Sequence, residues 1–158
     1  MAKPTVYVET TVIGYLTARQ QPDPIVAGHQ LATQKWWQSA RDECELVVSQ
    51  VVVDECSLGD PTAANERLQA VAGLKLVSAT AEVEIVTKAL LDRSAVPITE
   101  PKDAAHIAFA AAHGVEYLVT WNFRHIANPS MRRKIEEVLL SSGYRPPIIC
   151  SPEELSED

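Results

Sequence analysis

The segment PKDAAHIAFAAAHGVEYLVTWN (residues 101–122) contains a helix, a stop and a strand in direct succession. A proline followed by alanines and other apolar residues predicts a helix over residues 102–113, which Gly114 ends. This helix is apolar nearly all round, so we expect it to pack deeply against a sheet. The apolar run at residues 117–120 then predicts a strand. The segment therefore indicates an α/β fold.

The same alternation runs through the chain on both sides of this segment. Apolar runs predict five strands, at residues 5–8, 46–49, 75–77, 117–120 and 148–150. Helical patterns predict a short helix ending near residue 19, helices at 25–43, 51–58, 61–72, 81–92, 102–113 and 130–141, and a helical turn from Ser151. Strands that alternate with helices predict a single α/β domain over residues 1–158, whose parallel sheet of four to five strands has helices on both faces.

Composition limits the classes of protein to which the chain can belong. A length of 158 residues, 46% of them hydrophobic and 22% charged, fits one soluble domain with a sizeable core. No apolar stretch approaches the ~18 residues that span a bilayer. Three cysteines without a C-x-x-C motif predict free thiols. These features, with no signal-peptide pattern at the N-terminus, favour a cytoplasmic protein with no membrane segment.

Charge gives opposite indications about nucleic acid. A net charge of −7 argues against binding a phosphate backbone. Basic residues nevertheless gather after residue 122, and metal ions at clustered acids would reverse the local sign. The candidate RNA-binding residues in this region are Arg124, Arg132, Arg133 and Lys134.

Four acidic or amide side chains lie where α/β folds keep their chemistry. Glu9 follows the first strand, Glu55 lies shortly after the second, Asp103 opens a helix, and Asn122 follows the fourth strand. The carboxyl ends of parallel strands and the amino ends of helices face one crevice. We therefore expect these four side chains to meet there. Carboxylates gathered in one crevice repel one another, and a divalent cation would offset their repulsion.

Each of these residues also has a plainer interpretation. Glu9 could be an exposed glutamate at a strand end, Asp103 a helix cap, and Asn122 a turn residue. Glu55 is favoured over its neighbour Asp54 because its position on the helix lies nearer the apolar stripe.

Other polar and aromatic side chains are expected near this crevice. The hydroxyls of Thr10, Thr11 and Thr120 could hold waters or a carboxylate. His106, one turn after Asp103, is expected to support the site from behind rather than to bind the metal. The adjacent residues Trp36 and Trp37 could stack nucleobases, although core or dimer packing is the favoured interpretation.

Three acids and an amide suit Mg²⁺ or Mn²⁺, which prefer oxygen ligands. Such ions activate water and stabilise the charge of a phosphodiester under attack. The sequence contains no G-x-S-x-G motif and no glycine-rich phosphate loop, so no other catalytic motif competes.

The ordered set of motifs resembles the PIN-domain family, in particular VapC-like toxin ribonucleases. The pieces that carry the resemblance span nearly the whole chain: residues 6–11 (VYVETT), 52–59 (VVDECSLG), 103–108 (DAAHIA), 118–122 (LVTWN) and 149–155 (ICSPEEL). Each piece is weak by itself, and their order and spacing make the resemblance specific.

The resemblance implies a Rossmann-like PIN fold and a metal-dependent endoribonuclease that hydrolyses RNA phosphodiester bonds with Mg²⁺ or Mn²⁺. It makes Glu9, Glu55 and Asp103 the metal-binding acids, with Asn122 at the family's fourth position. It also implies a homodimer and a small antitoxin partner. Two residues depart from the family pattern, because the first acid is usually aspartate and the fourth often is. The missing charge at Asn122 predicts weaker binding of a second metal.

Three other functions remain open from the sequence. A PIN scaffold that binds RNA or protein without turnover would explain Glu9, Asn122 and the acidic surface. An aspartyl-phosphate enzyme would need an aspartate after the first strand, where Glu9 stands, and a lysine late in the sheet. A metal-free ribonuclease would depend on His106 or His125.

Overall fold

Five short parallel strands form one sheet in the computed structural model, which describes residues 2–156. The strands are β1 (Thr5–Val8), β2 (Glu45–Val48), β3 (Lys75–Leu76), β4 (Tyr117–Val119) and β5 (Ile148–Cys150). Their order across the sheet is β3-β2-β1-β4-β5, and every neighbouring pair is parallel. The predicted α/β architecture with a five-stranded parallel sheet is confirmed.

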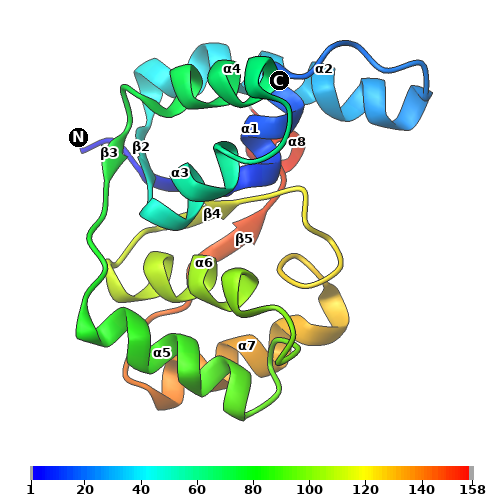
Figure 1. Cartoon of the computed structure of the whole chain (residues 1–158). Helices are drawn as coiled ribbons and strands as arrows, with labels where there is room; N and C mark the ends of the chain where they lie inside the picture. The colour runs from blue at the N-terminus through cyan, green and yellow to red at the C-terminus, as the bar shows by residue number, and fades with distance from the viewer. Residues whose placement is uncertain (1, 157–158) are drawn as a thin grey trace.

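Helices connect every pair of successive strands and close the C-terminal end. They are α1 (Thr10–Thr17), α2 (Pro24–Glu43), α3 (Gln50–Cys56), α4 (Pro61–Val71), α5 (Ala81–Asp92), α6 (Pro101–Ala112), α7 (Pro129–Ser141) and α8 (Pro152–Leu155). Helices α1, α2, α4 and α8 lie on one face of the sheet, and α5, α6 and α7 lie on the other (Figure 1). Helix α3 contacts both α4 and α6, so it bridges the two layers at one edge.

The strand order places a topological switch between β1 and β4. The chain builds β1, β2 and β3 outward in one direction and then returns to the other side of β1 for β4 and β5. Connections on the two sides of such a switch cover opposite faces, and the crevice between them is where open α/β sheets bind ligands. The carboxyl ends of β1 and β4 are therefore the first place to look for a site.

The core lies on both faces of the central strand. Val6 and Val8 are completely buried, and Ile107 and Leu118 are buried against them in the same cluster. Helix α6 is buried along most of its length, as its apolar sequence predicted. Tyr7 is also completely buried, although it carries a hydroxyl.

The predicted element boundaries hold to within one or two residues, and two of the differences matter for the site. Ser49 is not the last residue of β2 but the residue before α3, and Thr120 lies just beyond β4. The side chains of both residues take part in the polar contacts described below. Asp60 and Ser151 cap α4 and α8, because their side chains accept hydrogen bonds from backbone N–H groups of the first turns.

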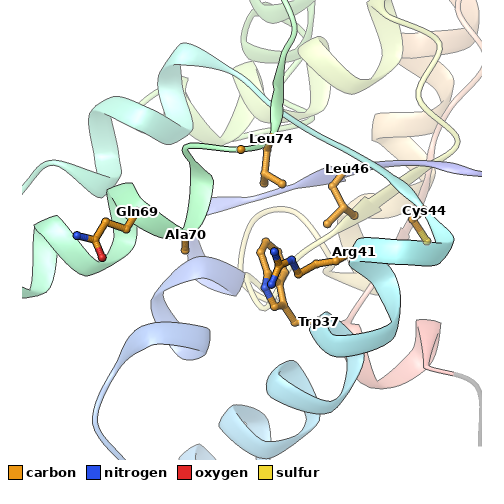
Figure 2. A pocket seen from close by; sticks show the side chains of 8 residues that line it. Trp37, Arg41, Cys44, Leu46, Gln69, Ala70 and Leu74 are labelled. Carbon is orange, nitrogen blue, oxygen red and sulfur yellow. The ribbon is translucent and has the colours of Figure 1, made fainter.

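At the opposite, amino-terminal edge of β2 and β3, Trp37 lines an open cavity of about 370 Å³ together with Arg41, Leu46 and Leu74 (Figure 2). Trp36 is buried in the core. The tryptophan pair thus lies away from the carboxyl ends of the strands, as core packing predicted. Among residues 2–156, no helix is long and apolar enough to cross a membrane.

Candidate metal centre

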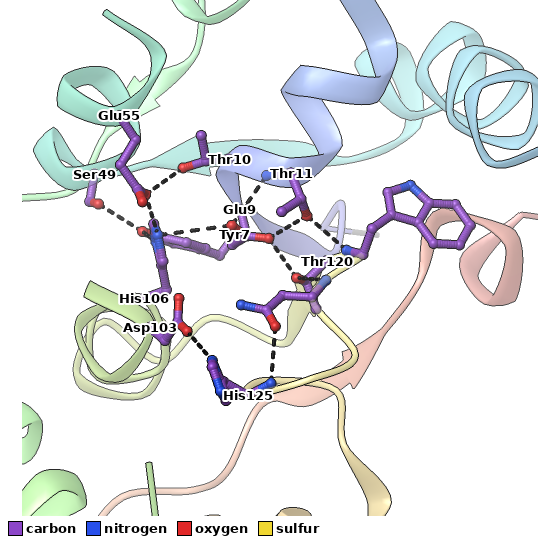
Figure 3. Close-up of polar contacts among 12 residues, drawn as sticks. Tyr7, Glu9, Thr10, Thr11, Ser49, Glu55, Asp103, His106, Thr120 and His125 are labelled. Carbon is purple, nitrogen blue, oxygen red and sulfur yellow. Dashed lines mark hydrogen bonds and ion pairs between the residues drawn. The ribbon is translucent and has the colours of Figure 1, made fainter. Parts of the chain in front are cut away.

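Glu9 lies at the junction of β1 and α1 and is 3% exposed. Its backbone N–H donates to the carbonyl of Val119, which holds the residue against β4. Its carboxylate accepts three hydrogen bonds: from the backbone N–H of Thr11 at 3.1 Å, the hydroxyl of Thr11 at 2.5 Å and the hydroxyl of Thr120 at 2.6 Å. The carboxylate therefore caps α1 and points into the crevice at the switch between β1 and β4 (Figure 3).

Glu55 reaches the same crevice from α3. Its Oε1 accepts hydrogen bonds from the hydroxyl of Thr10 and from Nε2 of His106, both at 2.7 Å. Burial by itself would raise the pKa of Glu55, but the hydrogen bonds from His106 and Thr10 and the charge of Lys102 outweigh it and lower the pKa. The neighbouring Asp54 is exposed and accepts a hydrogen bond from Gln50 instead. The structure thus places Glu55, and not Asp54, toward the crevice.

His106 joins the two glutamates. Its side chain is completely buried, and Nε2 lies 2.7 Å from Oε1 of Glu55 and 4.0 Å from Oε2 of Glu9. Ligand atoms of Glu9, Glu55 and His106 all lie within 4.8 Å of one another. This group is compact enough to surround one metal ion.

Asp103 belongs to a second group of possible ligands. Its Oδ2 lies 2.9 Å from Nδ1 of His125, and ligand atoms of Glu100, Asp103 and His125 lie within 4.8 Å of one another. The sequence predicted that the oxygens of Glu9, Glu55, Asp103 and Asn122 would meet at one point. The structure brings them to one edge of the sheet, but Asp103 is turned toward His125 (Figure 3).

Asn122 explains why His125 is there. Its Oδ1 accepts a hydrogen bond from the backbone N–H of His125 at 3.0 Å, which closes a turn and brings the histidine back toward α6. The predicted turn role of Asn122 is therefore present in the structure. Sequence reasoning missed the pairing of His125 with Asp103, since only the spacing of three residues after Asn122 hinted at it.

In the described part of the chain, the carboxylates of the crevice pair with histidines. Among the described residues, their only ion pairs are with His106 and His125, and no lysine or arginine pairs with Glu9, Glu55 or Asp103. Oε2 of Glu55 and Oδ1 of Asp103 accept no hydrogen bond from the described part of the chain. Buried or half-buried carboxylates with unshared oxygens fit a hard divalent cation such as Mg²⁺ or Mn²⁺.

The predicted RNA-binding residues differ in their availability. Arg124 and Arg133 are exposed, and Lys134 is partly buried. Arg132 donates from Nη2 to the carbonyl of Ile149 on β5, so part of its guanidinium is used by the fold. Arg124 lies closest in sequence to the crevice, in the loop after β4.

An aromatic cluster lies beside the acidic crevice. Trp121 follows Thr120, and its ring stacks on His29 with a centroid distance of 4.0 Å and an interplanar angle of 15°. Phe123 packs edge-on against both rings and is partly exposed. The aromatic side chains next to the crevice are therefore these, and not the pair at residues 36 and 37.

Comparison with known proteins supports the fold. A chain of the crystal structure of VapBC2 from Rickettsia felis, bound to a DNA fragment from their promoter, matches with a TM-score of 0.61 and 14% sequence identity. The match covers 93% of this chain and 98% of that one. No family model matches the sequence, and no curated protein is similar to it. The chain thus shares its fold with the matched VapBC2 chain, and the resemblance stated from its motifs is confirmed at the level of the fold.

Proposed function

We propose that the protein is a metal-dependent endoribonuclease that hydrolyses RNA phosphodiester bonds. The observation that carries the proposal is the pair of carboxylates Glu9 and Glu55, which converge at the switch point of the sheet and form no ion pair with a lysine or arginine of residues 2–156. Buried carboxylates in this state are costly unless a cation joins them. The VapC-like fold supports a toxin nuclease of a toxin–antitoxin pair.

Glu9, Glu55 and Asp103 would hold Mg²⁺ or Mn²⁺, and Asn122 has a second lone pair on its amide oxygen to offer. When bound, such an ion lowers the pKa of a coordinated water and offsets charge on the phosphate. Thr10, Thr11 and Thr120 orient the two glutamates, because each hydroxyl donates to a carboxylate oxygen.

Arg124, Arg133 and Lys134 would contact phosphates of the substrate. None of the three forms an ion pair with the described residues, so their charges are available. The whole chain carries a net charge of −7, and the attraction is therefore local. We expect cleavage to slow as salt concentration rises, because each neutralised phosphate releases counterions.

Cleavage of a fluorescent single-stranded RNA by the purified protein tests the proposal. We expect cleavage with Mg²⁺ or Mn²⁺, none with a chelator, and a loss of at least ~100-fold in Asp103→Asn, as for other groups that stabilise transition-state charge. The matched control is Asp92→Asn, whose exposed carboxylate pairs with Lys88 on α5. Cleavage that survives both the chelator and Asp103→Asn would refute the proposal and revive a histidine-based reaction.

The same proposal includes a small antitoxin and a homodimer in the cytoplasm. The structural neighbour is a VapBC complex, and this is the support for an antitoxin. Co-expression with the product of the adjacent gene, followed by light scattering, measures both interactions. A monomer that gains no partner from its own operon would remove this part of the proposal.

A binding scaffold without turnover is the second candidate function. Two observations favour it: Asn122 lacks the charge of a fourth acid, and its oxygen already accepts from the backbone of His125. Calorimetric titration with Mn²⁺ separates the two functions, since a scaffold without a metal site predicts no heat of Mn²⁺ binding. Such a scaffold also predicts that Glu9→Gln binds RNA as tightly as the wild type. Tight RNA binding without cleavage would then establish the scaffold.

A further inference from the structure

A row of polar side chains runs from the core to the acidic crevice. The hydroxyl of Tyr7 lies 2.7 Å from Oγ of Ser49 and 2.8 Å from Nδ1 of His106, and Nε2 of His106 lies 2.7 Å from Oε1 of Glu55. The side chains of Tyr7, Ser49 and His106 are all completely buried. The four groups therefore form one continuous chain of hydrogen bonds that ends on a carboxylate of the crevice (Figure 3).

Burial of these polar side chains costs free energy that apolar side chains of the same size would not cost. Tyr7 lies between Val6 and Val8 on the central strand, where a phenylalanine would fill the same space without a hydroxyl. A buried hydroxyl or imidazole loses its hydrogen bonds to water and must be fully partnered inside the protein. Among the described residues, each of the three side chains meets this requirement only through the others and through Glu55. The row is thus stable as a unit, with Glu55 as its last acceptor.

The direction of the row follows from its first member. Within residues 2–156, the hydroxyl of Ser49 has only Tyr7 as a hydrogen-bond partner, so its buried proton is satisfied only by donation to the Tyr7 oxygen. The phenol of Tyr7 has a donor of its own, and Nδ1 of His106 is the other group within hydrogen-bond distance of it. The Tyr7 proton then points to Nδ1 of His106, which must accept it. His106 consequently carries its proton on Nε2 and donates it to Glu55.

We propose that Tyr7, Ser49 and His106 form a directional hydrogen-bond relay that positions Glu55 for metal binding, and that His106 acts through Glu55 and is not itself a metal ligand. The proposal rests on the metal site of the proposed function. Oε1 of Glu55 is held by His106 and Thr10, which leaves Oε2 for the ion. The proton on Nε2 faces the carboxylates, so this nitrogen has no lone pair for a cation there.

The relay supplies rigidity that α3 alone lacks. Glu55 lies near the end of a helix of seven residues, and its side chain has three rotatable bonds. Two donors on one oxygen restrict the carboxylate to one orientation, and Tyr7 restricts the imidazole that donates to it. Loss of such an indirect contact to a metal ligand lowers metal affinity by roughly 10–100-fold in known sites.

The variant Tyr7→Phe tests the relay, because it removes one buried hydroxyl and keeps the ring. We expect the Mn²⁺ dissociation constant, measured by calorimetry, to rise by about 10-fold. The control Tyr117→Phe removes a hydroxyl on β4 that makes no hydrogen bond with the described residues, and it should leave the affinity unchanged. His106→Gln keeps an N–H donor and should retain more affinity than His106→Ala. Circular dichroism confirms that each variant is folded.

A measurement on the metal-free protein gives a readout that does not depend on activity. Nitrogen-15 NMR of the His106 ring should show a protonated Nε2 and an unprotonated Nδ1, and this preference should weaken in Tyr7→Phe. A proton on Nδ1 with a bare Nε2, or a change of Nε2 to a metal-bound shift on addition of Mg²⁺, would overturn the relay. Unchanged Mn²⁺ affinity in a folded Tyr7→Phe would overturn it as well. Failure of the wild type to bind any metal would instead refute the proposed function on which the relay rests.

Discussion

Replacement of Glu9 by glutamine distinguishes the effect of the buried carboxylate on folding stability from its role in metal binding. The amide oxygen can still accept from the hydroxyls of Thr11 and Thr120, but the amide nitrogen then faces the backbone N–H of Thr11. The lost cap of α1 costs about 1 kcal/mol. Removal of a negative charge near Glu55 offsets part of that cost. Without metal, we expect the unfolding midpoint of Glu9→Gln to fall by roughly 2–4 °C at most.

Bound metal is expected to widen the difference in stability between the wild type and Glu9→Gln. A ligand at 100 times its dissociation constant stabilises the folded state by about 2.7 kcal/mol. For a chain of this size that raises the unfolding midpoint by roughly 5–11 °C. We expect this rise with Mn²⁺ in the wild type and nearly none in Glu9→Gln, because one of the two converging carboxylates is gone.

Differential scanning calorimetry with and without Mn²⁺ measures both effects. The control Asp54→Asn removes an exposed carboxylate one residue from Glu55 that contacts Gln50, so it should keep the full rise. An equal rise in Glu9→Gln and wild type would refute the assignment of Glu9 to the metal site. An equal loss in both variants would indicate a general effect of charge.

Three further outcomes are expected. Asn122→Asp keeps an acceptor for the backbone N–H of His125 and adds a negative charge. Calorimetry should therefore show that Mn²⁺ binds on the order of tenfold more tightly, which corresponds to about 1.4 kcal/mol of added attraction. Unchanged affinity would place residue 122 outside the site. Thr33→Val leaves the indole N–H of Trp121 buried without its partner, and the urea midpoint should fall by the equivalent of about 1–3 kcal/mol at an unchanged slope, whereas no shift would mean that the contact contributes nothing. Burial raises the pKa of the Cys56 thiol from 9.0 to about 11, so the stabilising contribution of the protonated thiol is lost as pH rises through that interval. Alkylation of Cys56 near neutral pH should be much slower in the folded protein than in the unfolded chain. Equal alkylation rates would contradict the burial.

The elements of the fold could be predicted because their signals are local. Asp60 followed by Pro61 starts a helix, and Gly114, with a φ of +66°, allows α6 to end in a conformation that glycine adopts without strain. The choice of Glu55 over Asp54 also followed from helical phase, which depends on residues one turn away. In each case the decisive contact lies within a few positions of the residue.

The arrangement of the site depends on contacts between distant parts of the chain. The spacing of residues placed Asp103 at the amino end of a helix, but its pairing with His125 needed the turn closed by Asn122. The base-stacking interpretation of Trp36 was not supported by its position, since this residue packs in the core and Trp121 lies beside the crevice.

By itself, the sequence determined the succession of strands and helices along the chain, the parallel sheet and the identity of the acids at its edge. Those features arise from periodicity, caps and stops, which act over one or two turns of chain. Only the tertiary structure decided which oxygen each donor holds, since Tyr7 meets His106 across 99 positions and Glu55 meets it across 51. Hydrogen bonds are selective to within tenths of an ångström. Strand order and helix packing set positions at that scale, and no local pattern encodes them.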